Sequence, residues 1–570
     1  MATMNPYGKL DEAEQERLVA RRRTRRRITI IGISSIILVA VIVGAVVGAS
    51  QTKADKSRAD DQSPSSTIKA ICSSTLYPDS CYNSLAPTVK SGSVKPQDLY
   101  KLSVQVAMDE LSKASKNFDG IKKLNITDQR TLAAIESCQE LLSLALDHLN
   151  SSLSVEDVKF LEVFDDLRTW LSSAGTYQQT CIDELEYAST GLSTFINDNF
   201  KNSTEYTSNS LAIVTTFEES ISSLGAIGRR RLMSNGGVPE WLSYKERKLL
   251  QTPSSSIKAD AVVAKDGSGK YKTIGAALKD VPDKSEKRFV IYVKKGIYVE
   301  NVIIDKSKWN VMMVGDGKNA TIISGSLNVV DGTPTFQSAT FGKFCRVWPR
   351  IHRRDIGFRN TAGPAKHQAV ALLSTADLSV FYRCTMDAFQ DTLYTHSNRQ
   401  FYRECDIYGT VDFIFGNSAV VIQNSNILPK LPLLGQQNTI TAQGKFDPNQ
   451  NTGISIQNCT IWAAANLAGV STFLGRPWKN YSTTVYIQNM MGSLIDPKGW
   501  LPWIGTSAPK TIFYAEFQNL GPGAVTKNRV NWSGLKLNIS SAQAKKFTVG
   551  PFIKGDKWIP ATGVTYKSGL

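Results

Sequence analysis

Residues 381–416 read FYRCTMDAFQDTLYTHSNRQFYRECDIYGTVDFIFG, and one pattern occurs twice within this stretch. An aromatic pair is followed closely by Cys384 and again by Cys405, and an aspartate comes seven residues after each cysteine. These aspartates, Asp391 and Asp412, are 21 residues apart. If the chain coils with this period, equivalent residues stack on neighbouring strands, which lie about 4.8 Å apart. The pattern therefore predicts two carboxylates held side by side.

The same theme continues downstream and favours a coiled β architecture. Residues 421–427 (VIQNSNI) and 456–461 (IQNCTI) resemble the two earlier segments, and the Cys or Ser positions are spaced 21, 20 and 34 residues apart. A period near twenty with one insertion predicts the stacked coils of a parallel β-helix, because a single coil cannot bury its own apolar face. An antiparallel sandwich is the alternative, although hairpin signals are sparse.

The N-terminal part has a different period. Between residues 66 and 228 apolar side chains recur at helical spacing, which predicts an all-α four-helix bundle. Two disulfides are natural there: Cys72 and Cys81 are close in sequence, while Cys138 and Cys181 lie on the inward faces of two different helices. No residue of this part forms a convincing catalytic set, and we expect His148 to be a solvated helix residue.

The first 65 residues indicate entry into the secretory pathway. A basic tail, residues 1–27, precedes an uncharged apolar run, residues 28–49, which is long enough to cross a ~30 Å hydrocarbon layer as a signal-anchor. The basic flank predicts a cytosolic N-terminus, and a cleaved signal peptide is the alternative. Residues 50–65 form a linker. A secreted glycoprotein is expected, since N-x-Ser/Thr triplets begin at Asn125, Asn150, Asn202, Asn319, Asn458, Asn480, Asn531 and Asn538.

Residues 229–256 separate the two periodicities and contain two basic sites, so we expect proteolytic processing near Arg231 or Leu250. The chain from residue 252 onward has 37 Lys and Arg against 20 Asp and Glu, whereas residues 1–251 have 29 against 30. This surplus indicates a polyanionic partner for the C-terminal part, residues 257–570. Nucleic acid, a membrane surface and an acidic polysaccharide are the candidates.

Five further motifs occur in order along the C-terminal part: GIYVE at 296–300, QAVAL at 368–372, QDTLY at 390–394, DFIFG at 412–416 and LGRPW at 474–478. With these motifs this part resembles the plant pectin methylesterases. The helical part, residues 66–228, resembles the inhibitor-like pro-region joined to many of them. The resemblance implies an all-α bundle followed by an all-β right-handed parallel β-helix.

The resemblance also implies the chemistry: hydrolysis of the C6 methyl esters of homogalacturonan by an aspartyl esterase. Asp412 is expected to be the nucleophile and Asp391 the proton donor and later the base, with Gln368 and Gln390 holding the oxyanion. Arg476 is expected to orient Asp412 and to keep it ionised. Substrate contacts are expected from Thr335, Gln368, Arg476 and Trp478. No cofactor or metal is expected, and His352, His367 and His396 are expected to be structural.

Two departures from the family pattern stand out. Residues 342–354 (GKFCRVWPRIHRR) are unusually basic for a strand on a β-helix wall, so we suspect a gene-model error rather than a surface insertion. This makes a catalytically impaired pectin-binding or inhibitor-type protein the alternative, and a Ca²⁺-dependent pectate lyase the third possibility. Ser425 replaces a cysteine of the family, so Cys405 is expected to be a free buried thiol.

The expected biology is a membrane-anchored precursor that reaches the cell wall and modifies or degrades pectin there. Its partners would be methylesterified homogalacturonan, a processing protease and its own pro-region as intramolecular inhibitor or chaperone, but not nucleic acid. Residues 50–251 have 21 Lys and Arg against 26 Asp and Glu, and this negative balance could complement the basic C-terminal part.

Overall fold

The computed structural model describes residues 64–89, 95–118, 126–156, 160, 162–188, 192–228, 258–343 and 351–570. The chain divides into two compact units that do not follow its order. The first unit contains the described residues of Met1–Asp109, Ser152–Leu167 and Glu205–Leu232. The second contains those of Glu110–Ser151, Arg168–Thr204 and Met233–Leu570, so it joins helices of the N-terminal part to the whole C-terminal part.

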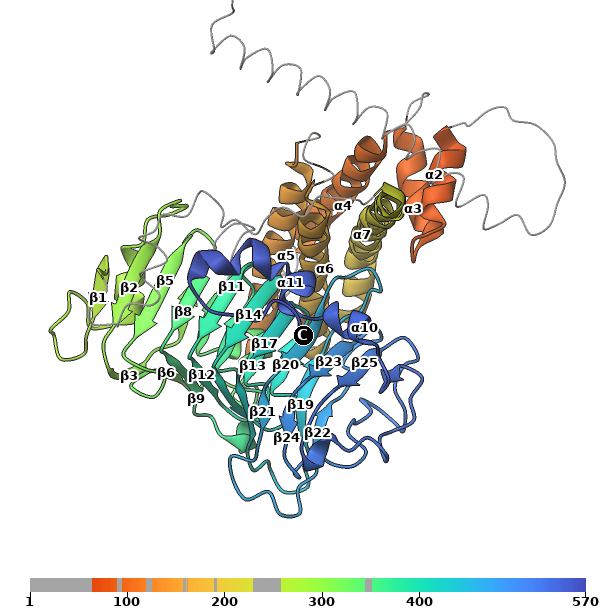
Figure 1. Ribbon diagram of the computed structural model, residues 1–570. Helices are drawn as coiled ribbons and strands as arrows, with labels where there is room; N and C mark the ends of the chain where they lie inside the picture. Colours follow the sequence, from red (N-terminus) through yellow and green to blue (C-terminus); the bar gives the residue numbers. More distant parts are fainter. Residues whose placement is uncertain are drawn as a thin grey trace, which may run out of the picture. The chain divides into compact units, whose positions relative to one another are not determined.

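Helices dominate the N-terminal part, as the periodicity predicts (Figure 1). They are α2 (Pro64–Cys72), α3 (Pro78–Leu85), η1 (Ala86–Thr88), α4 (Pro96–Phe118), α5 (Gln129–Leu153), α6 (Phe164–Ala188) and α7 (Ser193–Gly228). The apolar stripes face inward: Ile135 and Leu142 on α5 and Tyr177 on α6 are buried. Apolar residues recur at helical spacing from Tyr177 to Phe195 in the sequence. They belong to two helices, because α6 ends at Ala188 and α7 begins at Ser193.

Both predicted disulfides are present. Cys72–Cys81 ties α2 to α3 in the first unit, and Cys138–Cys181 ties α5 to α6 in the second. Ring contacts add to the packing within each unit. In the first, Tyr100 and Phe160 have centroids 5.2 Å apart, and in the second, Phe118 lies 6.0 Å from Phe195.

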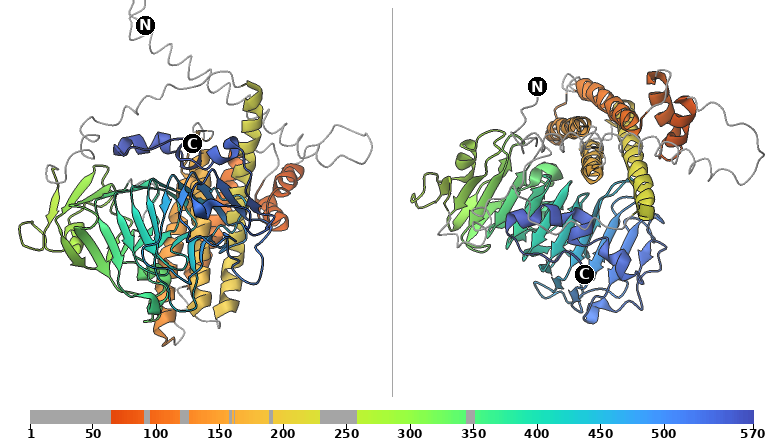
Figure 2. Two further views of the ribbon diagram at one scale, coloured as in Figure 1. Left: turned by 60° about the horizontal axis from the view of Figure 1, so that its bottom comes forward. Right: turned by 45° about the horizontal axis from the view of Figure 1, so that its top comes forward.

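The C-terminal part is a parallel β-helix with three sheets (Figures 1 and 2). In its described residues the first sheet has, in spatial order, β1 (Ala261–Val263), β2 (Phe289–Val293), β5 (Val311–Gly315), β8 (Ile351–Arg354), β11 (Ser379–Tyr382), β14 (Arg399–Arg403), β17 (Ala419–Gln423), β20 (Gly453–Gln457), β23 (Thr483–Ile487), β25 (Phe513–Phe517) and β26 (Leu535–Lys536). The second has β22 (Thr472–Gly475), β19 (Asn438–Gln443), β16 (Ile414–Gly416), β13 (Leu393–Thr395), β10 (Leu372–Ser374), β7 (Phe341–Lys343) and β4 (Val302–Ile304). The third has β24 (Met490–Met491), β21 (Thr460–Ile461), β18 (Asn426–Pro429), β15 (Asp406–Gly409), β12 (Thr385–Asp387), β9 (Gly357–Asn360), β6 (Thr321–Gly325) and β3 (Gly296–Val299).

The register confirms the stacking expected from the repeats. Thr385 pairs with Asp406, Asp406 with Asn426, and Asn426 with Thr460, so the Cys or Ser before each of them occupies one position on successive coils. Apolar side chains stack in the same way inside the coil. The rings of Phe381 and Tyr402 lie parallel with centroids 4.7 Å apart. The core is thus a column of equivalent residues along the helix axis.

Short helices cover parts of the β-helix. Helix α9 (Ile274–Lys279) packs on β1 and β4 near the first coil. After the last strand come α10 (Ser541–Lys545) and α11 (Val549–Ile553), drawn dark blue in Figure 1. Val549 and Ile553 are buried against Phe401 and Val421, on the outer face of the first sheet. This cover hides an apolar sheet face from water.

The basic segment 342–354 contributes a paired strand. Residues 344–350, including Cys345, lie outside the described residues, but β8 pairs in parallel with β5 and β11. The two arginines of β8 are buried and have polar contacts. Arg353 Nη1 donates to the Val311 carbonyl at 3.0 Å, and Arg354 Nε lies 3.5 Å from an Asp355 oxygen. The described end of this segment, β8, is therefore part of the first sheet.

No helix in the described ranges has the length and apolar character to cross a membrane. The expected anchor, residues 28–49, lies outside these ranges, as do the processing linker 229–256 and Asn125.

Candidate active site

Gln368, Asp391 and Asp412 precede three successive strands of the second sheet, β10, β13 and β16, whereas Arg476 follows β22. Gln368 forms an isolated parallel bridge with Gln390, and Asp391 N–H donates to the Val411 carbonyl at 3.1 Å. Leu393 pairs with Ile414, which places Asp391 and Asp412, each two residues earlier, on adjacent coils. Both aspartates have left-handed backbone angles, with φ of 63° and 51°, a conformation that Asp tolerates better than most residues. The structure therefore brings the predicted pair together.

Asp412 is held by a bidentate ion pair and by a hydroxyl group. Arg476 Nε and Nη2 donate to the Asp412 carboxylate at 2.8 and 2.6 Å. Thr439 Oγ1 donates to Asp412 Oδ1 at 2.6 Å and accepts the Asp412 N–H at 2.8 Å. Such charge-assisted, two-point contacts fix a carboxylate in one orientation. They hold the Asp412 side chain at the lining of the pocket.

Asp391 has a different environment. Burial, and to a smaller extent the neighbouring Asp412 carboxylate, raises the pKa of Asp391 well above its usual range, while Arg476 opposes this shift. Two carboxyl groups of one site are thus pushed toward different protonation states. This division is typical of an acid–base group beside an ionised partner.

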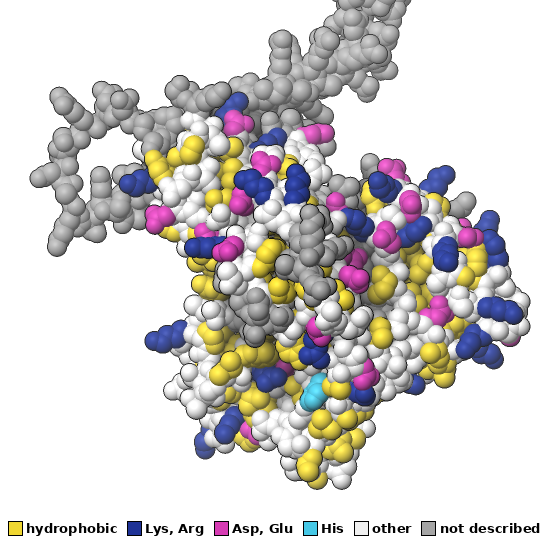
Figure 3. All heavy atoms as spheres, turned by 180° about the vertical axis from the view of Figure 1, so that it is seen from behind, with side chains coloured by type: hydrophobic (Ala, Val, Ile, Leu, Met, Phe, Trp, Pro, Cys, Tyr) yellow, Lys and Arg dark blue, Asp and Glu magenta, His cyan; other side chains and the backbone are white. Residues whose placement is uncertain are grey.

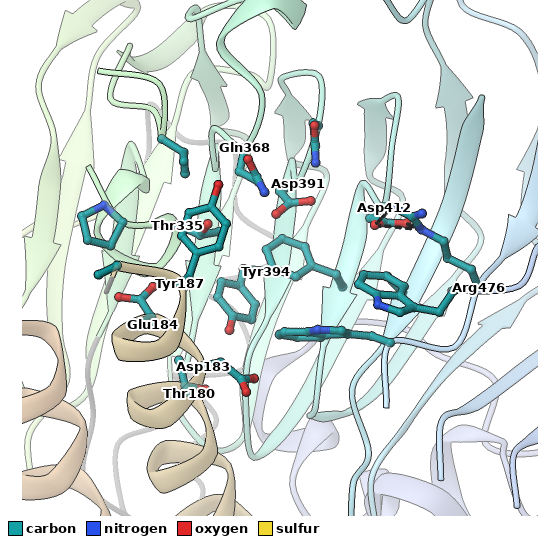
Figure 4. A pocket seen from close by; sticks show the side chains of 18 of the residues that line it. Thr180, Asp183, Glu184, Tyr187, Thr335, Gln368, Asp391, Tyr394, Asp412 and Arg476 are labelled. Carbon is teal, nitrogen blue, oxygen red and sulfur yellow. Dashed lines mark hydrogen bonds and ion pairs between the residues drawn. The ribbon is translucent and has the colours of Figure 1, made fainter. Parts of the chain in front are cut away.

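A pocket of about 360 Å³ opens over these groups (Figure 4). Its apolar wall consists of Tyr394, Phe415, Trp478 and Trp503, and Thr335 lies at its opposite end. The Arg476 guanidinium lies 4.4 Å from the centroid of the Trp503 ring, so this tryptophan also fixes the arginine. Flat aromatic faces beside a carboxylate pair suit the binding of a sugar ring.

Helix α6 forms another wall of this pocket, within the same compact unit. Figure 4 shows Thr180, Asp183, Glu184 and Tyr187 projecting from the helix beside the catalytic candidates. Lys479 Nζ lies 2.7 Å from Asp183 Oδ1, and Phe336 N–H donates to Glu184 Oε1 at 2.9 Å. Burial raises the pKa of Glu184 to about 7. The helix thus presents two adjacent acidic side chains to the site.

Two buried histidines join α5 and α6 to the β-helix, and one of them corrects an expectation. His148 is buried, not solvated: its Nδ1 lies 3.0 Å from the Leu144 carbonyl and its Nε2 3.2 Å from Asn398 Nδ2. It lies on the helix face that meets another element, which helical spacing alone did not show. Thr180 Oγ1 lies 2.9 Å from His396 Nε2, and burial lowers the pKa of His396 to about 3. Both side chains thus have structural contacts.

The free cysteines of the described ranges are absent from the pocket lining. Cys384, Cys405 and Cys459 are buried free thiols, and burial raises the pKa of Cys459 to about 12. Ser425 Oγ accepts the Cys405 N–H at 3.1 Å, which confirms that Cys405 has no disulfide at this position. In the described ranges no cluster of three or more His, Cys, Asp or Glu side chains could hold a metal ion.

Sequence reasoning missed Thr439, Trp503 and the acidic pair of α6. The strand register accounts for the position of Thr439. Ile414 pairs with Thr441, so Asp412 lies opposite Thr439 on the next coil. A loop between β18 and β19 lengthens this coil and hid that pairing in the sequence. The other residues belong to no repeat or motif, and only the folded chain brings them to the pocket.

Known families match both parts of the chain. The pectinesterase model matches residues 260–556, and the plant invertase/pectin methylesterase inhibitor model matches residues 66–213. A probable pectinesterase/pectinesterase inhibitor 46 of Arabidopsis thaliana is 53% identical over 573 residues, covering 99% of this chain and 100% of the relative. Pectinesterase 3 of Phaseolus vulgaris is 48% identical over 533 residues, covering 91% and 90%.

Among solved structures, a pectin methylesterase from carrot is 50% identical with a TM-score of 0.54. The match covers 55% of this chain and 99% of the carrot chain, so the solved carrot chain corresponds to about half of this chain. With a family model over more than half of its length and relatives matched from end to end, this chain belongs to the pectinesterase family and has an inhibitor-like region before its esterase part.

Proposed function

We propose that the protein hydrolyses the C6 methyl esters of homogalacturonan pectin, releasing methanol and leaving carboxylates. The observation that carries this proposal is the stacked pair of Asp391 and Asp412, with Arg476 bonded to Asp412 and a raised pKa at Asp391. Ester hydrolysis needs a nucleophile, an oxyanion site and a proton donor, and one pocket contains candidates for all three.

In the first step, an Asp412 oxygen attacks the ester carbonyl carbon at C6. The carbonyl becomes an oxyanion, which the side-chain amides of Gln368 and Gln390 stabilise. When this intermediate collapses, the bond to the methoxy oxygen breaks and Asp391 gives its proton to the departing methanol. Asp412 is then joined to the sugar as an anhydride, and Asp391 is ionised.

In the second step, water attacks the anhydride while Asp391 takes a proton from it. The bond between Asp412 and the substrate acyl carbon breaks, which restores the Asp412 carboxylate and frees a galacturonic acid group, and this group loses the second proton of the water to solvent and becomes a carboxylate. Asp391 is again protonated. Arg476 orients Asp412 throughout, and Trp478 and Thr335 contact the polysaccharide on the two sides of the reacting ester.

The N-terminal part would restrain this activity. The α6 residues Asp183 and Glu184 occupy the pocket that the polysaccharide needs, which supports a role for the pro-region as intramolecular inhibitor. Cleavage near Arg231 or Leu250 by a processing protease would then release the enzyme. We place the protein in the secretory pathway, as a glycoprotein anchored through residues 28–49 before processing, and its mature part in the cell wall.

The alternative of an impaired pectin-binding protein is not favoured, because β8 pairs normally and the catalytic candidates are assembled. Methanol release by the β-helix part, residues 257–570, decides between the two. We expect the wild type to release methanol from highly methylesterified pectin, and Asp412→Asn and Asp391→Asn each to lower kcat by about 10³-fold or more, because each loses an acid–base or nucleophilic group.

Asp283→Asn is the matched control, because Asp283 is an exposed carboxylate paired with Lys308 and is absent from the pocket lining. It should retain wild-type kcat. If none of these proteins releases methanol, the esterase proposal is contradicted. Full activity of Asp412→Asn would refute only the assignment of Asp412 as the nucleophile.

A further inference from the structure

The contacts of helix α6 reveal where the β-helix accepts a carboxylate. Lys479 lies at the edge of the catalytic pocket and lines a small adjoining cavity with Asp183 and Trp478. Its Nζ is 2.7 Å from the Asp183 carboxylate and 5.5 Å from the centroid of the Trp478 ring. Both side chains are about three-quarters buried there, at 24% and 22% exposure. A carboxylate beside a tryptophan face is thus held by a lysine of the β-helix.

The two arginines that line this pocket differ from Lys479. One keeps a carboxylate partner within the β-helix, and the other belongs to the N-terminal helices and would leave with them. Arg476 is bonded to Asp412, a residue of the β-helix itself. Arg130 belongs to α5 and donates to the Val329 carbonyl at 3.0 Å. Among the described ion pairs, that of Lys479 is with α6 and none is with a carboxylate of the β-helix. Removal of the N-terminal part therefore leaves a positive charge beside Trp478.

The second acidic side chain of α6 lies at another point of the pocket, where burial raises the pKa of Glu184 and favours its uncharged form. Glu184 accepts the Phe336 N–H next to Thr335, on the Gln368 side of the catalytic pair in Figure 4. Asp183 and Glu184 thus lie at two places along one wall of the pocket (Figure 4), and Asp183 lines the small adjoining cavity together with Trp478. Of these two side chains, Asp183 has an ion-pair partner on the β-helix, and its contact is the one that resembles a bound galacturonate carboxylate.

We propose that Lys479 binds the C6 carboxylate of an already de-esterified galacturonate residue next to the one being hydrolysed. This inference depends on the proposed function and adds a determinant of specificity to it. The ion pair is available to a carboxylate and not to a methyl ester, which has no charge, so Lys479 distinguishes the two states of the sugar packed near Trp478. The same contact makes the reaction product a competitor for the site.

The test uses the β-helix part, fully methylesterified pectin as substrate and de-esterified hexagalacturonate as competitive inhibitor. We expect Lys479→Gln to raise the ratio of the hexagalacturonate inhibition constant to the substrate KM by about fivefold or more, the scale of one partly buried ion pair. Lys479→Arg should restore most of this ratio. Lys510→Gln removes an exposed lysine outside the pocket and should leave the ratio at the wild-type value.

An unchanged ratio in Lys479→Gln overturns the proposal. A second measurement on the wild type applies even if that variant does not fold: hexagalacturonate should inhibit at least about fivefold more strongly than the neutral α-1,4-linked galactose hexamer, and added salt should reduce the difference. Equal inhibition by the two hexamers also overturns it. Failure of the esterase proposal is a separate result, because the wild type would then release no methanol.

Discussion

At the scale of single residues, the site depends on how Asp412 and Asp391 differ. Arg476 and Thr439 bond to Asp412 and hold its carboxylate in place, whereas burial raises the pKa of Asp391. The two aspartates occupy equivalent positions on adjacent coils, so the backbone does not distinguish them. Their neighbours on the next coils do, because only Asp412 has an arginine and a threonine within reach.

Thr439→Val tests the second of these contacts. The variant keeps the shape of the side chain but removes the hydroxyl that bonds to both the carboxylate and the N–H of Asp412. A hydrogen bond to a charged group contributes about 1.5–3 kcal/mol, so we expect kcat of the β-helix part to fall roughly 10-fold to 100-fold. Thr460→Val, at an exposed strand position, is the control. Steady-state methanol release measures both, and equal kcat values would show that Thr439 does not position Asp412.

At the scale of elements, α6 is the helix that meets the β-helix at its site. Its buried Tyr177 contacts Ser397, its Thr180 contacts His396, and its Asp183 and Glu184 enter the pocket. Helix α5 is joined to α6 by the Cys138–Cys181 disulfide. It also contacts the β-helix through an ion pair between Asp147 and Lys306 at 2.9 Å. The inhibitor-like role proposed for the N-terminal part therefore rests on one helix and its disulfide-linked neighbour.

The raised pKa of Glu184 predicts how pH affects this contact. Burial moves the pKa from 4.5 to about 7 when α6 occupies the pocket, so the bound state holds its proton more tightly than the free state. The contact is then strongest below pH 4.5 and weakens as the pH rises toward 7. We expect methanol release by the full chain, relative to the β-helix part alone, to increase across this interval.

Glu184→Gln should flatten much of that increase, because the amide does not titrate. Burial together with Asp305 also raises the pKa of Glu140 to about 7, so a part of the slope should remain. Glu136→Gln removes an exposed carboxylate of α5 and should behave like the wild type. A Glu184→Gln chain with the full wild-type pH slope would show that this carboxyl group does not control the contact.

At the scale of the whole molecule, the stacked coils make the site a property of the entire β-helix. The catalytic candidates come from several coils, so their relative positions depend on the regular pairing of the sheets. Lys and Arg side chains are spread over the surface seen in Figure 3 with hydrophobic ones between them, and they do not gather in one patch there.

Gly416→Ala tests this dependence on coil stacking. Gly416 ends β16 with φ of 123°, and a Cβ there would lie 2.2 Å from the Thr395 carbonyl oxygen on the adjacent coil. Backbone strain and this clash should lower the free energy of unfolding of the β-helix part by about 2 kcal/mol or more. Gly569→Ala, which meets nothing within 4 Å, should change it little. Urea unfolding measures both, and equal midpoints would contradict the argument.

The sequence by itself determined the coiled β fold, the helical part, both disulfides and the stacking of Asp391 on Asp412. These follow from periodicity, because a fixed period decides which residues share a face or a coil position. Only the tertiary structure decided that His148 is buried, that Thr439 and Trp503 belong to the site and that α6 places Asp183 against Lys479. These contacts join residues far apart along the chain, and no local pattern records which distant surfaces will meet.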